Sequence, residues 1–437
     1  MATDLLPPPL WLVIPFAGLL LMIATGPVLY PHFWHRFYPC ISGTLGLGVV
    51  GYYVMVMGDY VHPIEALAEY VQFIALLGAL YMVSGAILIR LDFPATPQYN
   101  LILLWLGAVL SNFIGTTGAS MLLIRPYMKM NKRNLKPYHI VFFIFMVSNI
   151  GGSLSPIADP PLFLLFLKGL PFSWPFWQGI LPWGLALGLL SLIFYGLERH
   201  NKKPISYRET DFKGVSIAGA YNLLLFCMII GAVFLDPKKI EGLPCINFEG
   251  HRLSYLRELI LLSIMVFVYL KADRKLLAEN HFTLAPLKEV AFIFIGIFAT
   301  MMPALALIEG FAGSETGKNL ISPSTLYWGT GLFSSILDNA PTCVTMLTAA
   351  MVAKLGNKEI IDFIAHYPTL LRAIAVASVF FGAMTYVGNG PNFMVRSIAE
   401  ERGVKMPSFG GYIWRYSLPF LLPILVVVWA CFFAFAG

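Results

Sequence analysis

Charged side chains are scarce in this sequence. Asp, Glu, Lys and Arg make up 12% of its 437 residues, roughly half the share found in soluble domains. This scarcity excludes an ordinary soluble protein. The formal net charge of +6 does not indicate a nucleic-acid partner, because the basic residues fall in loops between apolar segments.

Several motifs are missing as well. The five cysteines are scattered, with no Cys-x-x-Cys spacing, so the sequence predicts neither a disulfide framework nor a structural metal site. It contains no His-Glu-x-x-His, no Gly-x-Ser-x-Gly and no phosphate-binding glycine loop. We therefore expect a protein that is not an enzyme, needs no cofactor and draws its energy from an ion gradient.

Apolar segments dominate instead. Hydrophobic residues make up 58% of the chain, in runs long enough to cross a bilayer, which takes about 20 residues. The sequence predicts an all-α polytopic membrane protein with crossings at 10–30, 40–58, 64–90, 138–168, 174–198, 214–236, 253–271, 285–310, 366–401 and 410–436. Two further apolar segments, 99–124 and 324–352, are interrupted in the middle and predict re-entrant hairpins.

The order of these segments predicts two repeats. Residues 1–198 and 214–437 each contain five crossings and one hairpin, joined by a cytoplasmic linker at 199–213. An odd number of crossings turns the second repeat upside down relative to the first. Most Lys and Arg residues then fall on the side of the 125–137 loop, which the positive-inside rule makes cytoplasmic. We expect a bacterial inner-membrane protein with both termini outside.

Four polar, glycine-rich stretches interrupt the hairpins and the crossings 138–168 and 366–401. Non-helical backbone at membrane depth needs protein or a wet cavity to supply its hydrogen bonds. Matching interruptions in two halves are typical of secondary transporters. Their hydroxyl and amide groups are hard oxygen ligands for an alkali cation, and the candidate residues are Ser111, Asn112, Thr116, Thr117, Ser148, Asn149, Ser153, Asn339, Thr342, Asn389 and Asn392.

Two acidic residues, Asp159 and Asp338, lie within the interrupted elements. Ionisable groups at this depth are candidates for a functional site. A buried carboxylate can hold a proton or a metal cation but not both, which is the minimal chemistry of cation/proton exchange. We expect Asp338 to be the main switch and Asp159 its partner. In the alternative, Asp159 and the asparagines only cap restarting helices.

A basic residue, Arg396, lies within the second broken crossing, five residues beyond Pro391. It could bind an anionic substrate or neutralise an aspartate. The alternative is that its side chain extends toward the cytoplasmic headgroups.

These motifs resemble those of the ion transporter superfamily. The resemblance is strongest to the ArsB/NhaD-type permeases and the related citrate transporters, many of them described as sodium:proton antiporters. It rests on Ser111–Ser120, Ser148–Gly152, Asp159–Pro161 and Asp338–Thr342. The resemblance implies two inverted repeats, a homodimer, and a transport part that moves against a fixed scaffold in an elevator mechanism.

The sequence departs from the dicarboxylate branch of that superfamily, which has Ser-Asn-Thr at both hairpin tips. Here Phe113 follows Ser111-Asn112, and Asp338-Asn339 stands in place of Ser-Asn. The extra negative charge favours a cation as substrate. A sodium(lithium)/proton antiporter is therefore our first hypothesis. The alternatives are a sodium-coupled transporter of citrate or another oxyanion, and a non-transporting scaffold subunit, which the short loops disfavour.

Overall fold

The computed structural model describes residues 8–201, 214–235, 240, 242–248, 251–280, 282–336, 339–356 and 360–435. Most of the predicted linker and the candidate Asp338 lie outside these ranges.

Most of the described chain is helical, in agreement with the predicted all-α class. Its helices are α1 (Ile14–Leu29), α2 (Pro31–Met55), α3 (Val61–Gly85), α4 (Pro97–Met130), α5 (Pro137–Met146), α6 (Pro160–Leu167), α7 (Trp174–His200), α8 (Asn222–Val233), α9 (Leu256–Lys271), α10 (Arg274–Glu279), α11 (Ala285–Gly313), α12 (Glu315–Leu320), α13 (Pro323–Ile336), α14 (Asn339–Leu355), α15 (Ile360–His366), α16 (Pro368–Phe380), α17 (Gly390–Glu401), α18 (Phe409–Tyr412) and α19 (Leu422–Phe432).

Five helical segments of the described chain are long and apolar enough to cross a membrane, or six if α15 and α16, bent by 108°, count as one. The five are α3, α7, Leu287–Leu307 of α11, Phe409–Phe432, and α4, which qualifies by length and composition although it bends at Gly115. These spans identify an integral membrane protein. The ten predicted crossings and the inverted repeats stay predictions, because helices such as α8 and α9 are shorter than a full span.

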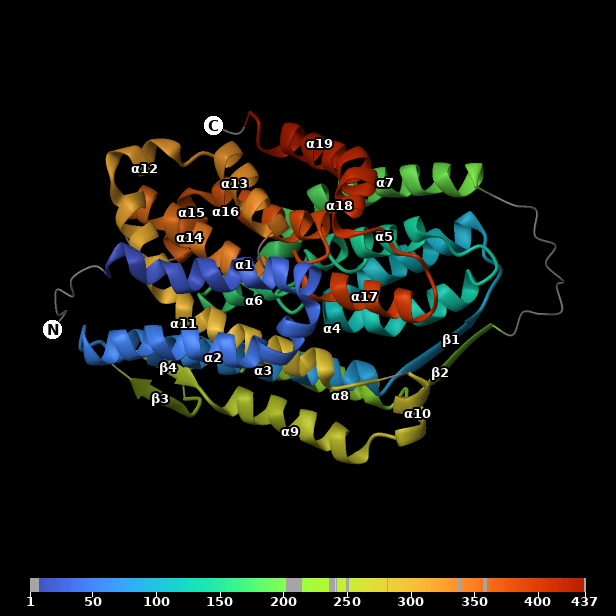
Figure 1. Ribbon diagram of the computed structural model, residues 1–437, viewed down its shortest axis with the longest axis horizontal. Coiled ribbons are helices and arrows are strands. Elements are labelled where there is room, and N and C mark those ends of the chain that lie inside the picture. Colours follow the sequence, from blue (N-terminus) through green and yellow to red (C-terminus); the bar gives the residue numbers. More distant parts are fainter. Residues whose placement is uncertain are drawn as a thin grey trace.

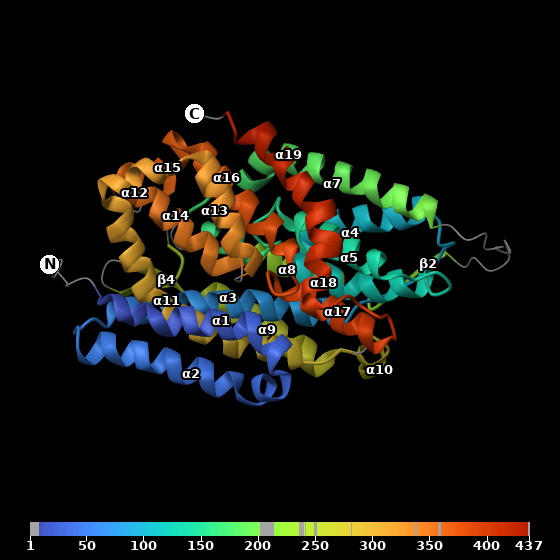
Figure 2. The same cartoon turned by 45° about the horizontal axis from the view of Figure 1, so that its top comes forward.

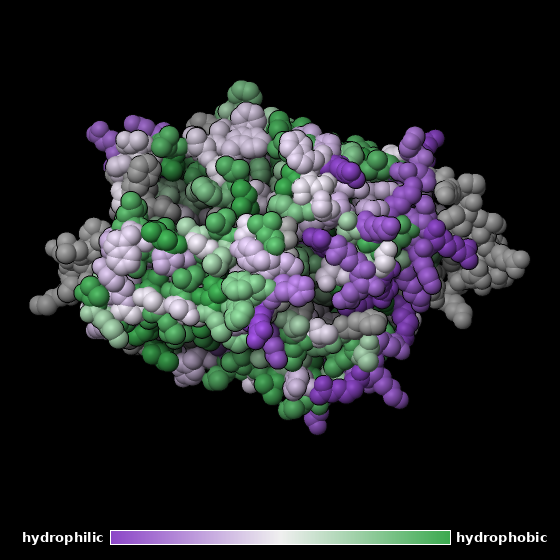
Figure 3. Space-filling view, viewed as in Figure 1, coloured by the Kyte–Doolittle hydropathy of each residue, from purple (hydrophilic) through white to green (hydrophobic). Residues whose placement is uncertain are grey.

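Most of the helices run along the long axis of the molecule in two layers (Figure 1). One layer contains α1, α2, α3, α9 and α11, of which α2, α3 and α9 lie in the lower half of both views (Figures 1 and 2). α11 packs against α2 and α3 within this layer and against α14 in the other. Hydrophilic side chains gather at the right-hand end of the molecule (Figure 3), where α10 and the end of α17 lie.

Two short antiparallel ribbons were not predicted. In the first, β1 (Leu88–Asp92) pairs with β2 (Gly214–Ala218), and in the second, β3 (Cys245–Phe248) pairs with β4 (His251–Ser254). The predicted crossing 64–90 is therefore too long at its end, because α3 ends at Gly85 and strand β1 begins at Leu88. The predicted crossing 40–58 starts too late, since α2 begins at Pro31, a residue well suited to a first helical turn.

α4 folds back on itself at Gly115. This residue has φ 79° and ψ 152°, which glycine adopts at little cost. Asn100 and Asn131, on opposite sides of the bend, donate to each other's amide oxygens at 3.0 and 2.7 Å. In an uninterrupted helix these residues would lie about 46 Å apart. α4 is thus a hairpin with two antiparallel arms, and the predicted hairpin 99–124 falls within it.

A second helix pair, α13 and α14, also packs side by side. Ile321, just before α13, packs against Ala349 and Ala353 of α14. A Cβ on Gly329 would lie 3.9 Å from Met346 Cε. α13 and α14 therefore lie side by side, and together they cover most of the segment predicted as a hairpin over 324–352.

Each remaining interrupted segment is a helix, a short 3₁₀ turn, an irregular stretch of bends or turns and a second helix. In one, α5 is followed by a turn at Ile150–Gly152 and by α6; in the other, α16 is followed by a turn at Phe381–Met384 and by α17. Asp159 and Asn389 occupy the N-cap positions of α6 and α17, but neither caps its helix with its side chain. Those side chains are thus free to bond elsewhere.

The contact between Asn100 and Asn131, at the end of the α4 hairpin away from Gly115, leads to a cross-linking prediction. In a chain whose five cysteines are replaced, Asn100→Cys with Asn131→Cys should form a disulfide on mild oxidation, because the two side chains are in contact. Mass spectrometry of the linked peptides measures the yield. Ile102→Cys with Asn131→Cys is the control, since Ile102 is 61% exposed on the outer face. Equal yields for both pairs would refute the hairpin.

Candidate functional site

Asp159 lies where the hairpins and the broken helices meet. Its Oδ1 accepts hydrogen bonds from Thr116 Oγ1 at 2.8 Å and from Asn389 Nδ2 at 3.0 Å. Its Oδ2 accepts one from Asn339 Nδ2 at 3.1 Å. The three donors come from the second arm of α4, from the start of α14 and from the residue before α17. The carboxylate thus gathers four elements around a side chain that is 2% exposed.

The carboxylate of Asp159 is hydrogen-bonded by neutral groups only, among the described residues. A buried carboxylate is costly unless it is paired or hydrogen-bonded, and among the described residues no Lys or Arg bonds to it. Three helices, α6, α14 and α17, begin beside it, and a helix N-terminus carries a partial positive charge. An ionised carboxylate can accept about four hydrogen bonds. With three in place, an acceptor position remains on Oδ2.

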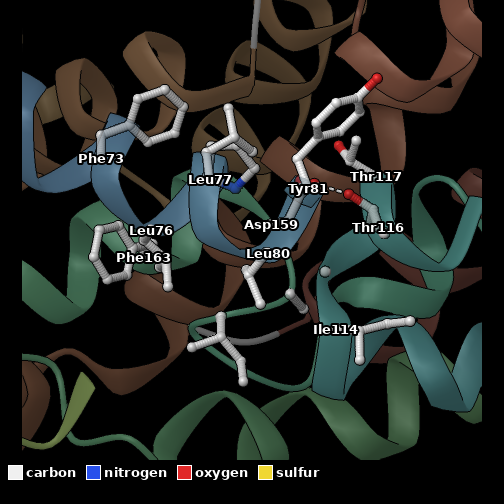
Figure 4. A pocket seen from close by; sticks show the side chains of 15 residues that line it. Phe73, Leu76, Leu77, Leu80, Tyr81, Ile114, Thr116, Thr117, Asp159 and Phe163 are labelled. Atoms are coloured by element: carbon white, nitrogen blue, oxygen red, sulfur yellow. Dashed lines mark hydrogen bonds between the residues drawn. The ribbon is translucent and has the colours of Figure 1, made fainter. Parts of the chain in front are cut away.

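A cavity opens beside Asp159 (Figure 4). Its polar side is formed by Thr116, Thr117 and Asp159, and its apolar side by α3, which contributes Leu80 and Tyr81 among others. The α3 wall belongs to the layer of α1, α2 and α11. The cavity therefore lies between that layer and the hairpin tip. An ion held at Asp159 would meet oxygen atoms on one side and hydrocarbon on the other.

A second polar network joins the two broken segments directly. Asn389 Nδ2 also donates to the carbonyl of Ser148 at 3.2 Å, and Asn149 Nδ2 donates to Asn392 Oδ1 at 2.7 Å. Asn392 in turn donates to the carbonyls of Gly382 and Thr385 at 2.8 and 2.9 Å. These amides replace the backbone hydrogen bonds that each break leaves open.

Other predicted residues have different surroundings. Asn112 fastens the first arm of α4 to the neighbouring turn, donating to the Gly151 carbonyl at 2.7 Å and accepting from the Leu154 amide at 2.9 Å. Ser111 donates to the Ala108 carbonyl at 2.8 Å. Neither hydrogen-bonds to Asp159 in the described structure. Of the remaining candidates, two are buried near the breaks, namely Thr342 and Ser153.

Among the buried side-chain oxygens that have no hydrogen-bond partner in the described part of the chain, two belong to this region, Asn149 Oδ1 and Ser153 Oγ. Native structures leave few buried polar atoms unpaired, and each such atom is a place where water or an ion can bind. Both lie in the first broken segment, close in sequence to the network of amides.

Arg396 lies apart from this cluster. Its Nε donates to Glu400 Oε1 at 3.0 Å, and its guanidinium lies 4.6 Å from the ring centroid of Tyr386. Both contacts stay within the α17 region. The structure therefore does not place it on Asp159 as a charge partner. Asp338, predicted as the main switch, lies outside the described residues.

Some residues of the site escaped prediction. Ser334 donates to Asn339 Oδ1 at 2.6 Å, and nothing in its spacing indicated this contact. Glycines allow the close packing: a Cβ on Gly382 would lie 2.5 Å from Asn339 Oδ1, and one on Gly152 would lie 2.3 Å from Thr116 Cγ2. The abundance of glycine in the breaks was the available signal, but it did not show which side chain each glycine admits.

An integral membrane protein with interrupted helices around a buried carboxylate belongs to the transporter class. A family model described as "Putative citrate transport" matches residues 6–433. The chain belongs to this family, which confirms the resemblance to the ion transporter superfamily. No curated protein matches the sequence.

The packing around Asn339 generates a second prediction. Gly382→Ala should lower the stability of the protein by about 1–3 kcal/mol, as overpacking of a buried site does, because its Cβ displaces the Asn339 amide. Thermal unfolding of the purified protein measures this. Gly390→Ala is the matched control in the same broken segment, since its Cβ meets nothing within 4 Å. Equal stabilities of the two variants would contradict the packing argument.

Proposed function

We propose that this protein is a sodium(lithium)/proton antiporter and that Asp159 carries the exchange. The observation that supports this most directly is the burial of Asp159 among neutral donors. A resident Lys or Arg would neutralise the carboxylate permanently. Three amide and hydroxyl donors instead keep it in place and leave its negative charge uncompensated. Such a site is suited to bind a mobile cation.

Competition at Oδ2 of Asp159 accounts for antiport. The acceptor position left on this oxygen can take a proton or a sodium ion, but binding of one removes the charge that attracts the other. Thr116 and Thr117 line the adjoining cavity and offer further oxygens. Asp338, placed by sequence at the second hairpin tip, would contribute a second carboxylate.

The position of the cavity supports a moving transport part. α4, α6, α14 and α17 hold the site, while α3 forms the facing apolar wall. Sliding of the hairpins and broken helices along α3 would expose Asp159 to either side of the membrane. In this proposal the protein works as a homodimer in the bacterial inner membrane with its termini outside, as the resemblance and the charge distribution imply.

Reconstitution tests the antiport proposal. Proteoliposomes of the wild-type protein, loaded with a pH-sensitive dye, should move protons when sodium or lithium is added. Asp159→Asn should reduce this flux to that of empty liposomes, because an amide can neither release a proton nor hold a cation by charge. Asp362→Asn, at an exposed carboxylate on α15, is the control. Proton flux that survives Asp159→Asn would eliminate the proposed role.

A second candidate function is sodium-coupled uptake of citrate or another oxyanion, which the family description favours. In that case the helix N-termini around Asp159 and the guanidinium of Arg396 would attract the anion. The negative charge of Asp159 opposes this at the described site. A scaffold without transport activity is a third candidate, and it would gain support if no ion moved in any assay.

Arg396 separates the first two candidates. Since Arg396 pairs with Glu400 and Tyr386, Arg396→Ala should leave sodium-driven proton flux within about twofold of wild type, as is usual for an ion pair near the surface. Labelled-citrate uptake is measured in the same liposomes. Sodium-dependent citrate uptake in wild type, abolished by Arg396→Ala, would replace the antiport proposal by the citrate one.

A further inference from the structure

Ser334 has one hydroxyl hydrogen and two acceptors. Its Oγ lies 2.6 Å from Asn339 Oδ1 and 2.6 Å from the backbone carbonyl of Ser378. All three residues are buried. A single hydroxyl hydrogen can point to only one of these oxygens at a time, although the hydroxyl can also accept. In the described arrangement the Ser334 hydroxyl can therefore donate to only one of these two oxygens at a time.

Turning over the Asn339 amide removes this competition for the hydroxyl hydrogen of Ser334. In the described orientation its nitrogen donates to Asp159 Oδ2 and its oxygen faces Ser334. In the reversed orientation its oxygen would face Oδ2, and its nitrogen would donate to Ser334 Oγ. The Ser334 hydrogen could then serve the Ser378 carbonyl alone. The series of hydrogen bonds that links Asn339, Ser334 and Ser378 then contains two bonds, where the described orientation allows one.

The reversed amide suits a site that holds a cation. An amide oxygen next to an ionised carboxylate is repelled by it, but it becomes a ligand once a positive ion sits between them. Gly382 leaves room for either orientation, since a Cβ there would lie 2.5 Å from the amide oxygen and 2.7 Å from the nitrogen of Asn339. Both ends of the amide are thus about equally close to Gly382.

We infer that Ser334 is a positioning residue that lets the Asn339 amide reverse when sodium occupies the Asp159 site. In the empty site, the amide nitrogen of Asn339 donates to the carboxylate of Asp159. In the site that holds sodium, the amide oxygen of Asn339 contacts the ion, and the Ser334 hydroxyl accepts a hydrogen bond from Asn339 where it donated one before. This inference rests on the proposed function, because it takes sodium as the ion that loads.

Removal of the hydroxyl should weaken sodium binding selectively. Ser334→Ala takes one hydrogen bond from the empty state and two from the loaded state. The sodium Kd should therefore rise about fivefold, the effect of one net hydrogen bond. Ser334→Thr, which keeps a hydroxyl, should restore binding to within about twofold of wild type. Sodium-dependent thermal shifts of the purified protein give the Kd of each variant.

Ser335→Ala is the matched control. Ser335 lies in the same helix, and its Oγ donates to the Leu332 carbonyl at 2.7 Å. This variant should bind sodium as the wild type does. Ser334→Cys keeps the site filled if the alanine variant does not fold, and its weaker hydrogen bonding should also raise the Kd.

The outcomes separate this inference from the proposed function. A lower melting temperature for Ser334→Ala with an unchanged sodium Kd would mean an ordinary structural role and would overturn the inference. A wild-type protein that binds no sodium would overturn both proposals. If sodium binds but moves no protons in liposomes, antiport fails, and the comparison of Kd values still decides the role of Ser334.

Discussion

The rest of the structure around the helix breaks depends on one buried carboxylate, Asp159, to which no Lys or Arg bonds in the described part of the chain. Such a charge persists in a protein interior only if hydrogen bonds replace its water. Asp159 obtains them from Thr116, Asn339 and Asn389, which belong to separate segments of the chain. The helix breaks stabilise the negative charge further, because α6, α14 and α17 all begin at this point, and the N-terminus of a helix carries a partial positive charge. The interruptions and the buried acid thus stabilise each other.

Close approach at the breaks depends on residues without side chains. Gly115 takes the left-handed conformation that turns α4 into a hairpin, while Gly152 and Gly382 admit Thr116 and Asn339 at distances where a Cβ would collide. The polar side chains can therefore meet at the centre of an apolar bundle. Asn100 and Asn131 lock the other end of the first hairpin, so its tip is held at a defined depth.

The sequence indicated the elements better than their partners. Polar and glycine-rich interruptions are local, so the breaks near Gly115, Asp159 and Asn389 could be predicted along with several candidate ligands. The contacts of Asp159 with Asn339 and Asn389, 180 and 230 residues apart in sequence, could not be predicted, because the local sequence of each break does not show which distant amide will face it. The first ribbon was missed because β1 continues an apolar segment that is typical of a helix. The positive charge of Arg396 suggested an ion pair but not that Glu400 would provide it.

Neutral amides differ from a fixed counter-charge in one physical respect. An arginine beside Asp159 would form a buried ion pair, and breaking such a pair leaves an uncompensated charge at a cost of several kcal/mol. Asparagine and serine can each donate or accept, so they can stabilise the carboxylate when it is empty and tolerate a positive ion when it is loaded. A site that binds and releases an ion at every cycle, as proposed for Asp159, needs two states of similar free energy. Neutral amide and hydroxyl groups are compatible with that requirement, and a guanidinium would not be.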